Sequence, residues 1–320
     1  MKSHIARQDS AYFILNCLNV KSIKITVQDF TGVYAEQPFM QGLQKAASTD
    51  GEIRWFDCTR IDGTDCYCDD EAQAILRKQI EFSKTPALRQ AQGPSSISTP
   101  GIHFFDNGNY HYMSKLWTDS IREPFDLVVF DHHPDMQPPR FEGILSCGGW
   151  IKEVLDKNKF LQNVTVIGVA DHLVEEIRED LSQANAADIL DRVTFIRESE
   201  LKALPQNLSS RVYSKLANDP SSLYISIDKD ALNTQEAATN WDQGSLTFEQ
   251  LSETLQAFAQ NRKILGIDIC GERARDMGFE DTAAADALNN ALNEKLYGIL
   301  TSLADKEMSH QVRHDINGFS

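Results

Sequence analysis

Short apolar runs alternate along the chain with stretches in which apolar residues recur at helical spacing. Near the N-terminus, residues 22–35 alternate apolar and polar side chains, which is typical of a half-buried strand. Six later runs are apolar and carry little charge, as strands of a parallel sheet covered on both faces do. They are IHFF (102–105), DLVVF (126–130), VTVIGVA (164–170), VTFI (193–196), LYISI (223–227) and ILGIDI (264–269).

The segments between these runs predict helices. The stretch that follows residue 70 has an apolar stripe at helical spacing, and four later segments also fit helices, at 149–159, 172–184, 247–260 and 280–303. This alternation predicts an α/β fold, a doubly wound and mainly parallel sheet flanked by helices. We expect residues 1–320 to form one domain, with the Pro-, Gly- and Ser-rich segment 85–101 as an exposed loop or insertion.

Composition and net charge limit the classes of binding partner and the cellular compartment that we expect for this protein. The chain has 47 acidic and 31 basic residues and a net charge of -16, which argues against nucleic acid as a partner. It has no run of about 18 apolar residues, so we expect no membrane span and no export signal. Its six cysteines are irregularly spaced, which is typical of a reducing compartment. We therefore expect a soluble, cytoplasmic protein.

Candidate chemistry gathers at the carboxyl ends of the predicted strands, where ligands bind in doubly wound sheets. Asp131, His133 and Asp135 follow DLVVF directly, and Asp228 and Asp230 follow LYISI. Residues two apart at a strand end project to the same side, so each set can converge if the chain remains extended there. The segment after IHFF ends in a further histidine, His111.

These residues together predict a metal centre. Clustered carboxylates repel one another, and a divalent cation removes that penalty. Carboxylate oxygens mixed with imidazole nitrogens suit Mn²⁺, Fe²⁺ or Zn²⁺. Six ligands are enough for two ions, which about 3.5 Å apart would lower the pKa of a shared water. A lone Asp or His is more often structural, and we favour that interpretation for Asp106 and His103.

The motifs resemble those of the ureohydrolases, the family of arginase, agmatinase and formiminoglutamase. Residues 108–111 match the first glycine and the histidine of the family's Gly-Gly-Asp-His turn. Residues 131–135 match Asp-Ala-His-x-Asp, and 226–234 match Ser-x-Asp-x-Asp-x-x-Asp-Pro. The resemblance covers about residues 100 to 300 and implies an arginase-like fold.

The resemblance also implies roles for individual residues. Asp131 and Asp228 would bridge two Mn²⁺ ions per chain, and a metal-activated hydroxide would attack the substrate carbon. Asp135 would also hydrogen-bond the hydroxide and shuttle a proton, and Glu272, displaced by one position, would contact the substrate guanidinium. The implied metal ligands are His111, Asp131, His133, Asp135, Asp228 and Asp230.

The implied substrate contacts depart from arginase. Gln137 stands where arginase has an asparagine, Ser146 is kept, and Trp150 replaces a histidine. Asp242 lies where the family has a Gly-rich substrate loop. These departures argue against free arginine and favour another guanidino or amidino substrate, small or peptidyl. The resemblance leaves a homo-oligomer open.

We therefore expect a hydrolase that cleaves a C–N bond other than a peptide bond. Three alternatives remain. Asp131-His132-His133 is the signature of DHH-type Mn²⁺ phosphoesterases, although residues 1–125 lack the Asp-x-Asp that those enzymes need. A single-zinc deacylase would share the fold. A degenerate relative would keep its metal and only bind a partner or ligand.

Overall fold

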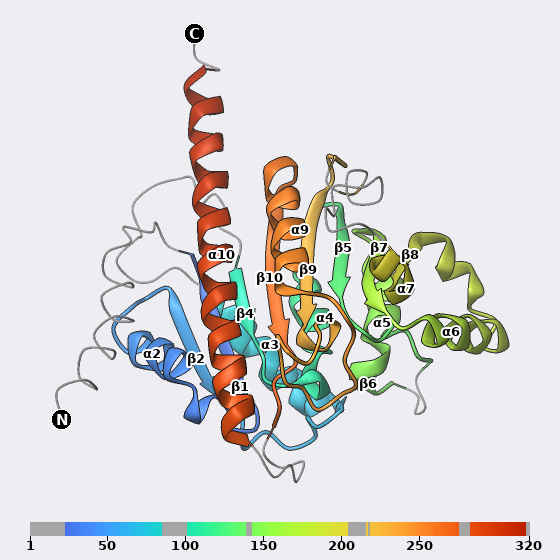
Figure 1. The fold of residues 1–320 in the computed structure, drawn as a ribbon, viewed down its shortest axis with the longest axis horizontal. Helices are drawn as coiled ribbons and strands as arrows, with labels where there is room; N and C mark the ends of the chain where they lie inside the picture. Colours follow the sequence, from blue (N-terminus) through green and yellow to red (C-terminus); the bar gives the residue numbers. More distant parts are fainter. Residues whose placement is uncertain are drawn as a thin grey trace.

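The fold is an eight-stranded parallel sheet with helices on both faces, as the computed structural model shows (Figure 1). The strand order is β2-β1-β4-β10-β9-β5-β7-β8, and every neighbouring pair in it is parallel. The predicted α/β, doubly wound, single-domain class is confirmed. The described residues are 23–84, 101–138, 143–203, 216, 218–274 and 282–317, with side chains described up to residue 303.

All seven predicted strands overlap observed ones. The strands of the large sheet are β1 (Ile25–Asp29), β2 (Ile53–Asp57), β4 (Gly101–Phe104), β5 (Phe125–Phe130), β7 (Leu161–Val169), β8 (Val193–Arg197), β9 (Ser222–Asp228) and β10 (Ile264–Cys270). Two short strands, β3 (Tyr67–Cys68) and β6 (Leu145–Ser146), pair antiparallel beside it.

The sheet divides the apolar core into two layers, and helices cover the layer on each face. Apolar side chains of α2, α9 and α10 pack on one face, and those of α3, α4, α5 and α6 pack on the other. The helices are α2 (Pro38–Ala47), α3 (Asp70–Lys84), α4 (Met113–Thr118), α5 (Trp150–Lys157), α6 (Asp171–Gln183), α7 (Glu198–Ala203), α9 (Phe248–Asn261) and α10 (Thr282–Asn317). Short 3-10 turns are η1 (Val33–Glu36), η2 (Gly108–Tyr110), η3 (Cys147–Gly149), η4 (Ala187–Arg192) and η5 (Lys229–Ala231).

The sequence patterns missed several elements and one boundary. The edge strand β2 has only its first residue buried, so it lacks an apolar run. Helix α10 continues to residue 317, beyond the predicted end at 303. The loop predicted at 85–101 lies outside the described residues except for Gly101, which begins β4. None of the helices in the described part of the chain has the length and apolar character of a membrane span.

A buried ion pair ties together the amino-terminal ends of the central strands. Arg262, directly after α9, lies 2.7 Å from the Asp126 carboxylate on β5 and donates to the Ser221 carbonyl beside β9. Asp126 also accepts the backbone N–H of Asn163 on β7. One guanidinium therefore links three neighbouring strands at the edge opposite the predicted metal centre.

Removing that guanidinium should destabilise the fold strongly. Arg262→Met leaves the buried Asp126 carboxylate without its cation, so we expect the free energy of unfolding to fall by about 3–5 kcal/mol. Denaturant titration measures the change. The matched control is Arg197→Met, because the Arg197 and Glu175 side chains of that pair are 27% and 63% exposed. We expect the control to cost less than about 1 kcal/mol. Equal losses in the two variants would contradict the proposed role.

Two buried carboxyl groups meet where β1 and β4 end. Asp106 accepts the backbone N–H groups of Phe30 and Thr31 and of its neighbour Asn107, as its predicted turn-forming role requires. Burial, and next the Asp29 carboxylate, raise the pKa of Asp106 to about 7. Burial raises the pKa of Asp29 to about 6. The pair therefore holds a proton at pH values where exposed aspartates have lost theirs.

This pair should make folding pH-dependent. Both folded-state pKa values lie above the ordinary value of 3.8, so between pH of about 4 and 7 the folded chain binds more protons than the unfolded chain. The stability that the pair contributes is thus lost as pH rises through that window. Asp29→Asn removes one titrating group and lowers the pKa of Asp106, so its stability should fall less steeply than that of the wild type. Denaturant titrations at pH values across this window measure how steeply the free energy of unfolding falls. The surface variant Asp156→Asn is the control and should follow the wild-type curve.

Candidate metal centre

The sheet order brings three strand ends together at one edge. Cys270, the last residue of β10, is in register with Asp228, the last residue of β9. The pairing of Phe130 with Ile227 then sets Asp131, the residue after β5, beside Asp228. The turn η2, after β4, delivers His111 to the same place. The predicted gathering of chemistry at the carboxyl edge is therefore observed.

One half of the cluster surrounds the His111 imidazole. Its Nδ1 atom lies 3.0 Å from Asp135 Oδ2, 3.2 Å from Asp131 Oδ2 and 3.5 Å from Asp228 Oδ2. Possible ligand atoms of His111, Asp131 and Asp135 all lie within 4.8 Å of one another. The three carboxylates come from two different strand ends and meet at one nitrogen.

The other half surrounds His133. Its Nδ1 atom lies 2.9 Å from Asp230 Oδ2 and 3.5 Å from Asp131 Oδ1. Asp131 thus faces both imidazoles, one with each carboxylate oxygen. Backbone N–H groups fix the carboxylates, because Asp131 Oδ1 accepts from His133 and Asp228 Oδ1 accepts from Asp230. The six residues predicted as ligands are all in this cluster, and their role as ligands remains a prediction.

The cluster is an anionic site buried in the protein. Burial, and next the neighbouring carboxylates, raise the pKa of Asp228 to about 7 and also raise the pKa of Asp230. Burial alone would lower the pKa of His111 and His133, but the adjacent carboxylates raise both pKa values above the ordinary value. Without a cation, protonated imidazoles supply the positive charge that the carboxylates need.

The arrangement fits a divalent metal pair. Each imidazole has its Nε2 atom engaged on the far side, with Ser226 Oγ at 2.9 Å from His111 and Asp242 Oδ1 at 3.2 Å from His133. Such contacts fix the tautomer in which Nδ1 offers its lone pair to a metal. Asp131 Oδ2 is buried and accepts no well-aligned hydrogen bond from any described residue. Both features are those of a site built to receive a cation.

Trp150 positions Asp135. The indole Nε1 donates to Asp135 Oδ2 at 2.7 Å, and the Trp150 ring lies 4.9 Å from the ring of His111. Asp135 has a φ of 45°, a left-handed conformation that is uncommon outside glycine. Trp150 is 0% exposed, so its placement favours holding Asp135 over the substrate contact that the sequence suggested.

The exposed rim of the cluster lies on the side of His133. Asp242, with a side chain 68% exposed, pairs with His133, and its loop is fixed because the Gly244 N–H donates to the Asp230 carbonyl. Next to it, Trp241 donates from Nε1 to Asn109 at 3.0 Å, and its ring lies 5.6 Å from that of His133. The predicted contact Asp242 and the aromatic Trp241 are therefore the exposed groups nearest His133.

Two other predicted substrate contacts lie on the Asp135 side. Gln137 is exposed, and its backbone N–H donates to the Gly148 carbonyl. Ser146 ends β6 and is half-buried. The structure places both on segments that flank η3, and their contact with a substrate remains a prediction.

Glu272 lies in a buried polar network behind the cluster. Its Oε1 pairs with the Lys229 ammonium and accepts from Asn293, and its Oε2 accepts from Gln37 at 2.9 Å. Lys229 separates Asp228 from Asp230 in the chain and is fully buried. Both Glu272 oxygens are thus engaged, which favours neutralising Lys229 over the predicted contact with a substrate guanidinium.

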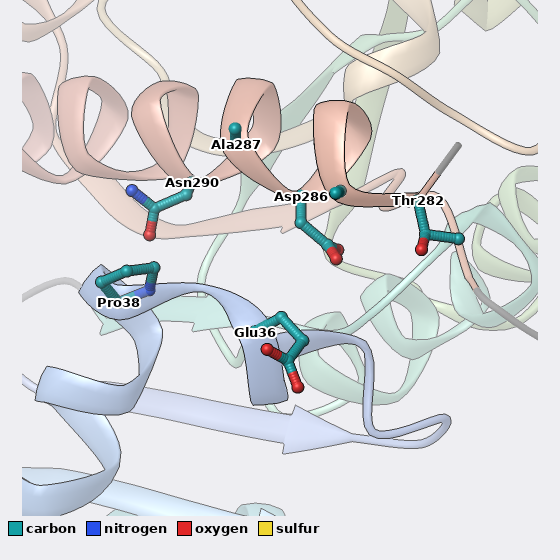
Figure 2. Close-up of a pocket in the computed structure, with 7 residues that line it drawn as sticks. Glu36, Pro38, Thr282, Asp286, Ala287 and Asn290 are labelled. Atoms are coloured by element: carbon teal, nitrogen blue, oxygen red, sulfur yellow. The ribbon is translucent and has the colours of Figure 1, made fainter.

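A separate pocket of about 530 Å³ opens between η1 and the start of α10 (Figure 2). Figure 2 shows Glu36 and Asp286 on opposite walls, one from η1 and the other from α10. The described residues that line it include no histidine or cysteine and no member of the metal cluster. The pocket is therefore distinct from the candidate metal centre.

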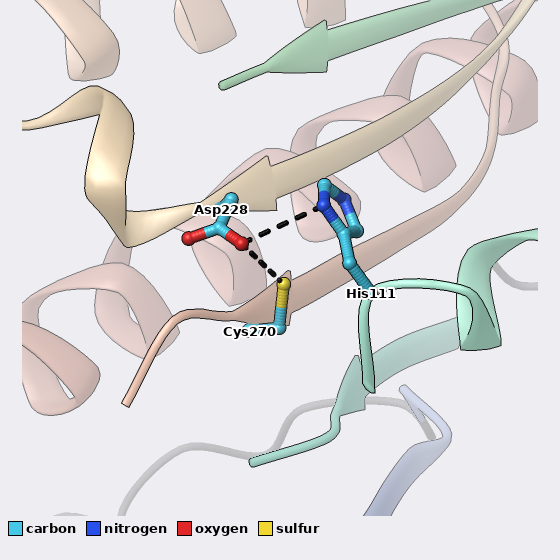
Figure 3. A group of neighbouring side chains, drawn as sticks. All are labelled: His111, Asp228 and Cys270. Carbon is cyan, nitrogen blue, oxygen red and sulfur yellow. Dashed lines mark hydrogen bonds and ion pairs between the residues drawn. The ribbon is translucent and has the colours of Figure 1, made fainter. Parts of the chain in front are cut away.

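Cys270 is the residue that the sequence interpretation missed. Its Sγ atom lies 3.3 Å from Asp228 Oδ2, on the same carboxylate oxygen that faces His111 (Figure 3). Its signal was present in the sequence, since it ends the last predicted strand at the edge where the other candidates gather. It was overlooked because that strand was interpreted as the carrier of Glu272.

Comparison with known proteins agrees with this geometry. The family model described as "Arginase family" matches residues 40–286. An uncharacterised protein of Thermotoga maritima is 29% identical over 248 residues, which are 78% of this chain and 79% of that protein.

Among solved structures, the agmatine ureohydrolase of Thermoplasma volcanium has a TM-score of 0.59 at 14% identity, over 92% of this chain and 94% of that one. The Mn²⁺-containing formiminoglutamase of Trypanosoma cruzi has a TM-score of 0.55 at 8% identity, over 92% and 98% of the two chains. The structural matches share the fold, and the family model covers most of the sequence. The chain belongs to the arginase family.

Proposed function

We propose that this protein is a binuclear manganese hydrolase that cleaves a C–N bond of a guanidino or amidino substrate. The observation that carries the proposal is the convergence of two imidazoles and four carboxylates, with both Nδ1 atoms directed inward and an Asp131 oxygen left without a hydrogen bond. Membership in the arginase family supports hydrolysis, and the Mn²⁺ in the Trypanosoma cruzi relative supports the choice of metal.

In this proposal His111, Asp131, Asp135 and Asp228 would hold one ion. Asp131, Asp228, His133 and Asp230 would hold the other. When bound, the two ions would lower the pKa of a shared water so that it ionises near neutral pH. The family's chemistry and this donor set agree, because carboxylate and imidazole ligands suit Mn²⁺.

The protein's own groups then orient the reactants. Trp150 holds Oδ2 of Asp135, which leaves Oδ1 as the atom that we propose takes the proton of the attacking water and passes it to the leaving nitrogen. Asp242 lies at the exposed rim, where its carboxylate can pair with a cationic guanidinium while the Trp241 ring flanks it. Gln137 and Ser146 would contact the remainder of the substrate on the opposite side.

Metal content tests the proposal first. After purification with Mn²⁺, we expect two equivalents per chain by elemental analysis, and a loss in both Asp131→Asn and Asp228→Asn because each change removes a shared anionic ligand. The surface variant Asp156→Asn should bind like the wild type. Wild type and variants are then screened for urea release from arginine, agmatine, guanidino acids and arginyl peptides. One zinc per chain with no second ion, persisting in Asp135→Ala, would indicate the deacylase instead, and a chain that binds no metal would refute the hydrolase.

The role of Asp242 predicts a change in substrate binding. Losing one charge-assisted hydrogen bond costs about 1.5–3 kcal/mol, so we expect Asp242→Asn to raise KM for a cationic guanidino substrate about tenfold or more. The change in kcat should be smaller than the change in KM. The assays contain saturating Mn²⁺, because Asp242 also pairs with the proposed metal ligand His133 and its loss would weaken metal binding. Steady-state kinetics with parallel metal analysis separate the two effects. An unchanged KM at full metal occupancy would exclude Asp242 as the guanidinium contact.

A further inference from the structure

A sulfur atom, Cys270 Sγ, lies beside the proposed metal position next to His111. Cys270 Sγ, Asp228 Oδ2 and a His111 ring nitrogen lie within 4.8 Å of one another, and all three residues are buried (Figure 3). Figure 3 shows the thiol and the imidazole directed at the same oxygen of Asp228. The other oxygen of that carboxylate already accepts the N–H of Asp230.

We propose that Cys270 is a thiolate ligand of the ion held by His111 and Asp228, so that this one position of the proposed centre, which takes Mn²⁺ when Mn²⁺ alone is supplied, selects Zn²⁺ or Co²⁺ when the ions compete. The inference rests on the proposed function, since it adds a ligand to the same centre. Sulfur binds Zn²⁺ at about 2.3 Å, and nitrogen or oxygen binds it at about 2.0–2.2 Å. Ligand atoms around one ion are then about 3–3.6 Å apart. The observed S–O separation of 3.3 Å and N–O separation of 3.5 Å both fall in that range.

A carboxylate oxygen beside His111 is a second observation that favours a bound cation at this position. Asp131 is 1% exposed, and its Oδ2 accepts no well-aligned hydrogen bond from any described residue although it lies 3.2 Å from His111 Nδ1. This oxygen and the thiol approach the same imidazole from two strand ends, so a cation bound beside His111 would meet both.

The local backbone explains why a thiol reaches this place. Gly271 has a φ of 92°, and a Cβ atom there would lie 2.3 Å from Asp228 Oδ1, so no side chain is tolerated directly after Cys270. The next residue, Glu272, turns away to pair with Lys229. The end of β10 therefore presents sulfur to the cluster, whereas the family resemblance predicted that this segment delivers the Glu272 carboxylate to the substrate.

A thiolate changes which metal the site selects. Sulfur is a soft donor that favours Zn²⁺ over Mn²⁺, and affinity for divalent ions also rises from Mn²⁺ to Co²⁺. The His133 position has only nitrogen and oxygen donors among the described residues. We therefore expect the two positions to differ, with Mn²⁺ retained more readily at the His133 side.

Cobalt spectroscopy tests the proposal without relying on activity. The full-length chain is stripped of metal with a chelator and titrated anaerobically with Co²⁺. A sulfur-to-cobalt charge-transfer band should grow in the near ultraviolet, and Cys270→Ser should lose this band while keeping the weaker visible cobalt bands. Cys270→Ala replaces it if serine destabilises the site. Zn²⁺ affinity relative to Mn²⁺ should fall at least about tenfold in the variant, the loss that even outer contacts of a metal site cause.

The matched control removes two other thiols that lie next to each other, those of Cys66 and Cys147. Cys66 and Cys147 are neighbours, because the Cys147 backbone N–H donates to the Cys66 carbonyl at 2.9 Å, so we treat them as a second possible thiol site for cobalt. The Cys66→Ser/Cys147→Ser variant should therefore retain the charge-transfer band. Bound Co²⁺ with no such band, or a band that survives in Cys270→Ser, would overturn the thiolate and leave the proposed function intact. A chain that binds no Co²⁺ would refute the metal centre, and the thiolate with it.

Discussion

The structure of this site depends on the burial of four like charges at one edge of the sheet. Asp131, Asp135, Asp228 and Asp230 are all at least nine-tenths buried, and burial, followed by the neighbouring carboxylates, raises the pKa of Asp228 and of Asp230. The fold keeps these side chains together because three adjacent parallel strands end there, and their register cannot shift without exposing the apolar core. The imidazoles of His111 and His133 supply the compensating charge in the metal-free chain, so positive charge is required whether or not a metal is bound.

The need for compensating charge also applies to the buried polar network of Lys229 and Glu272 behind the metal cluster. Lys229 places an ammonium between two of the carboxylate residues, and a buried ammonium needs an anion of its own. Glu272 supplies it, with Gln37 and Asn293 satisfying the remaining lone pairs. The carboxylate that the family resemblance assigned to the substrate is thereby committed to the interior. In the proposed function, recognition of a cationic substrate would then fall to Asp242, the carboxylate that is exposed at the rim.

The sequence predicted the sheet and the gathering of its strand ends because both follow from local patterns. Apolar runs define buried parallel strands, and the carboxyl ends of neighbouring strands meet at one edge. The expectation that the chain stays extended beyond these strands is wrong, because the 3-10 turn η5 follows Asp228 and Asp135 has a left-handed φ of 45°. The edge strand β2 escaped detection because only Ile53 in it is fully buried, so it has no apolar run. The role of Trp150 escaped because its partner Asp135 is fixed by a left-handed backbone turn that no periodicity reveals. Cys270 and Glu272 depend on side-chain directions across strands β9 and β10, which adjacency in the chain does not encode.

The burial of the cluster decides where a substrate can approach. In the described part of the chain, the fully buried Trp150 covers His111 on one side and Ser226 lies behind it, so His111 is only 1% exposed. The His133 half is the more open one, bordered by Trp241 and Asp242. In the proposed function, substrate selection would therefore depend on the loop that carries Trp241 and Asp242 more than on the metal motifs, because this loop holds the exposed aromatic ring and carboxylate beside His133.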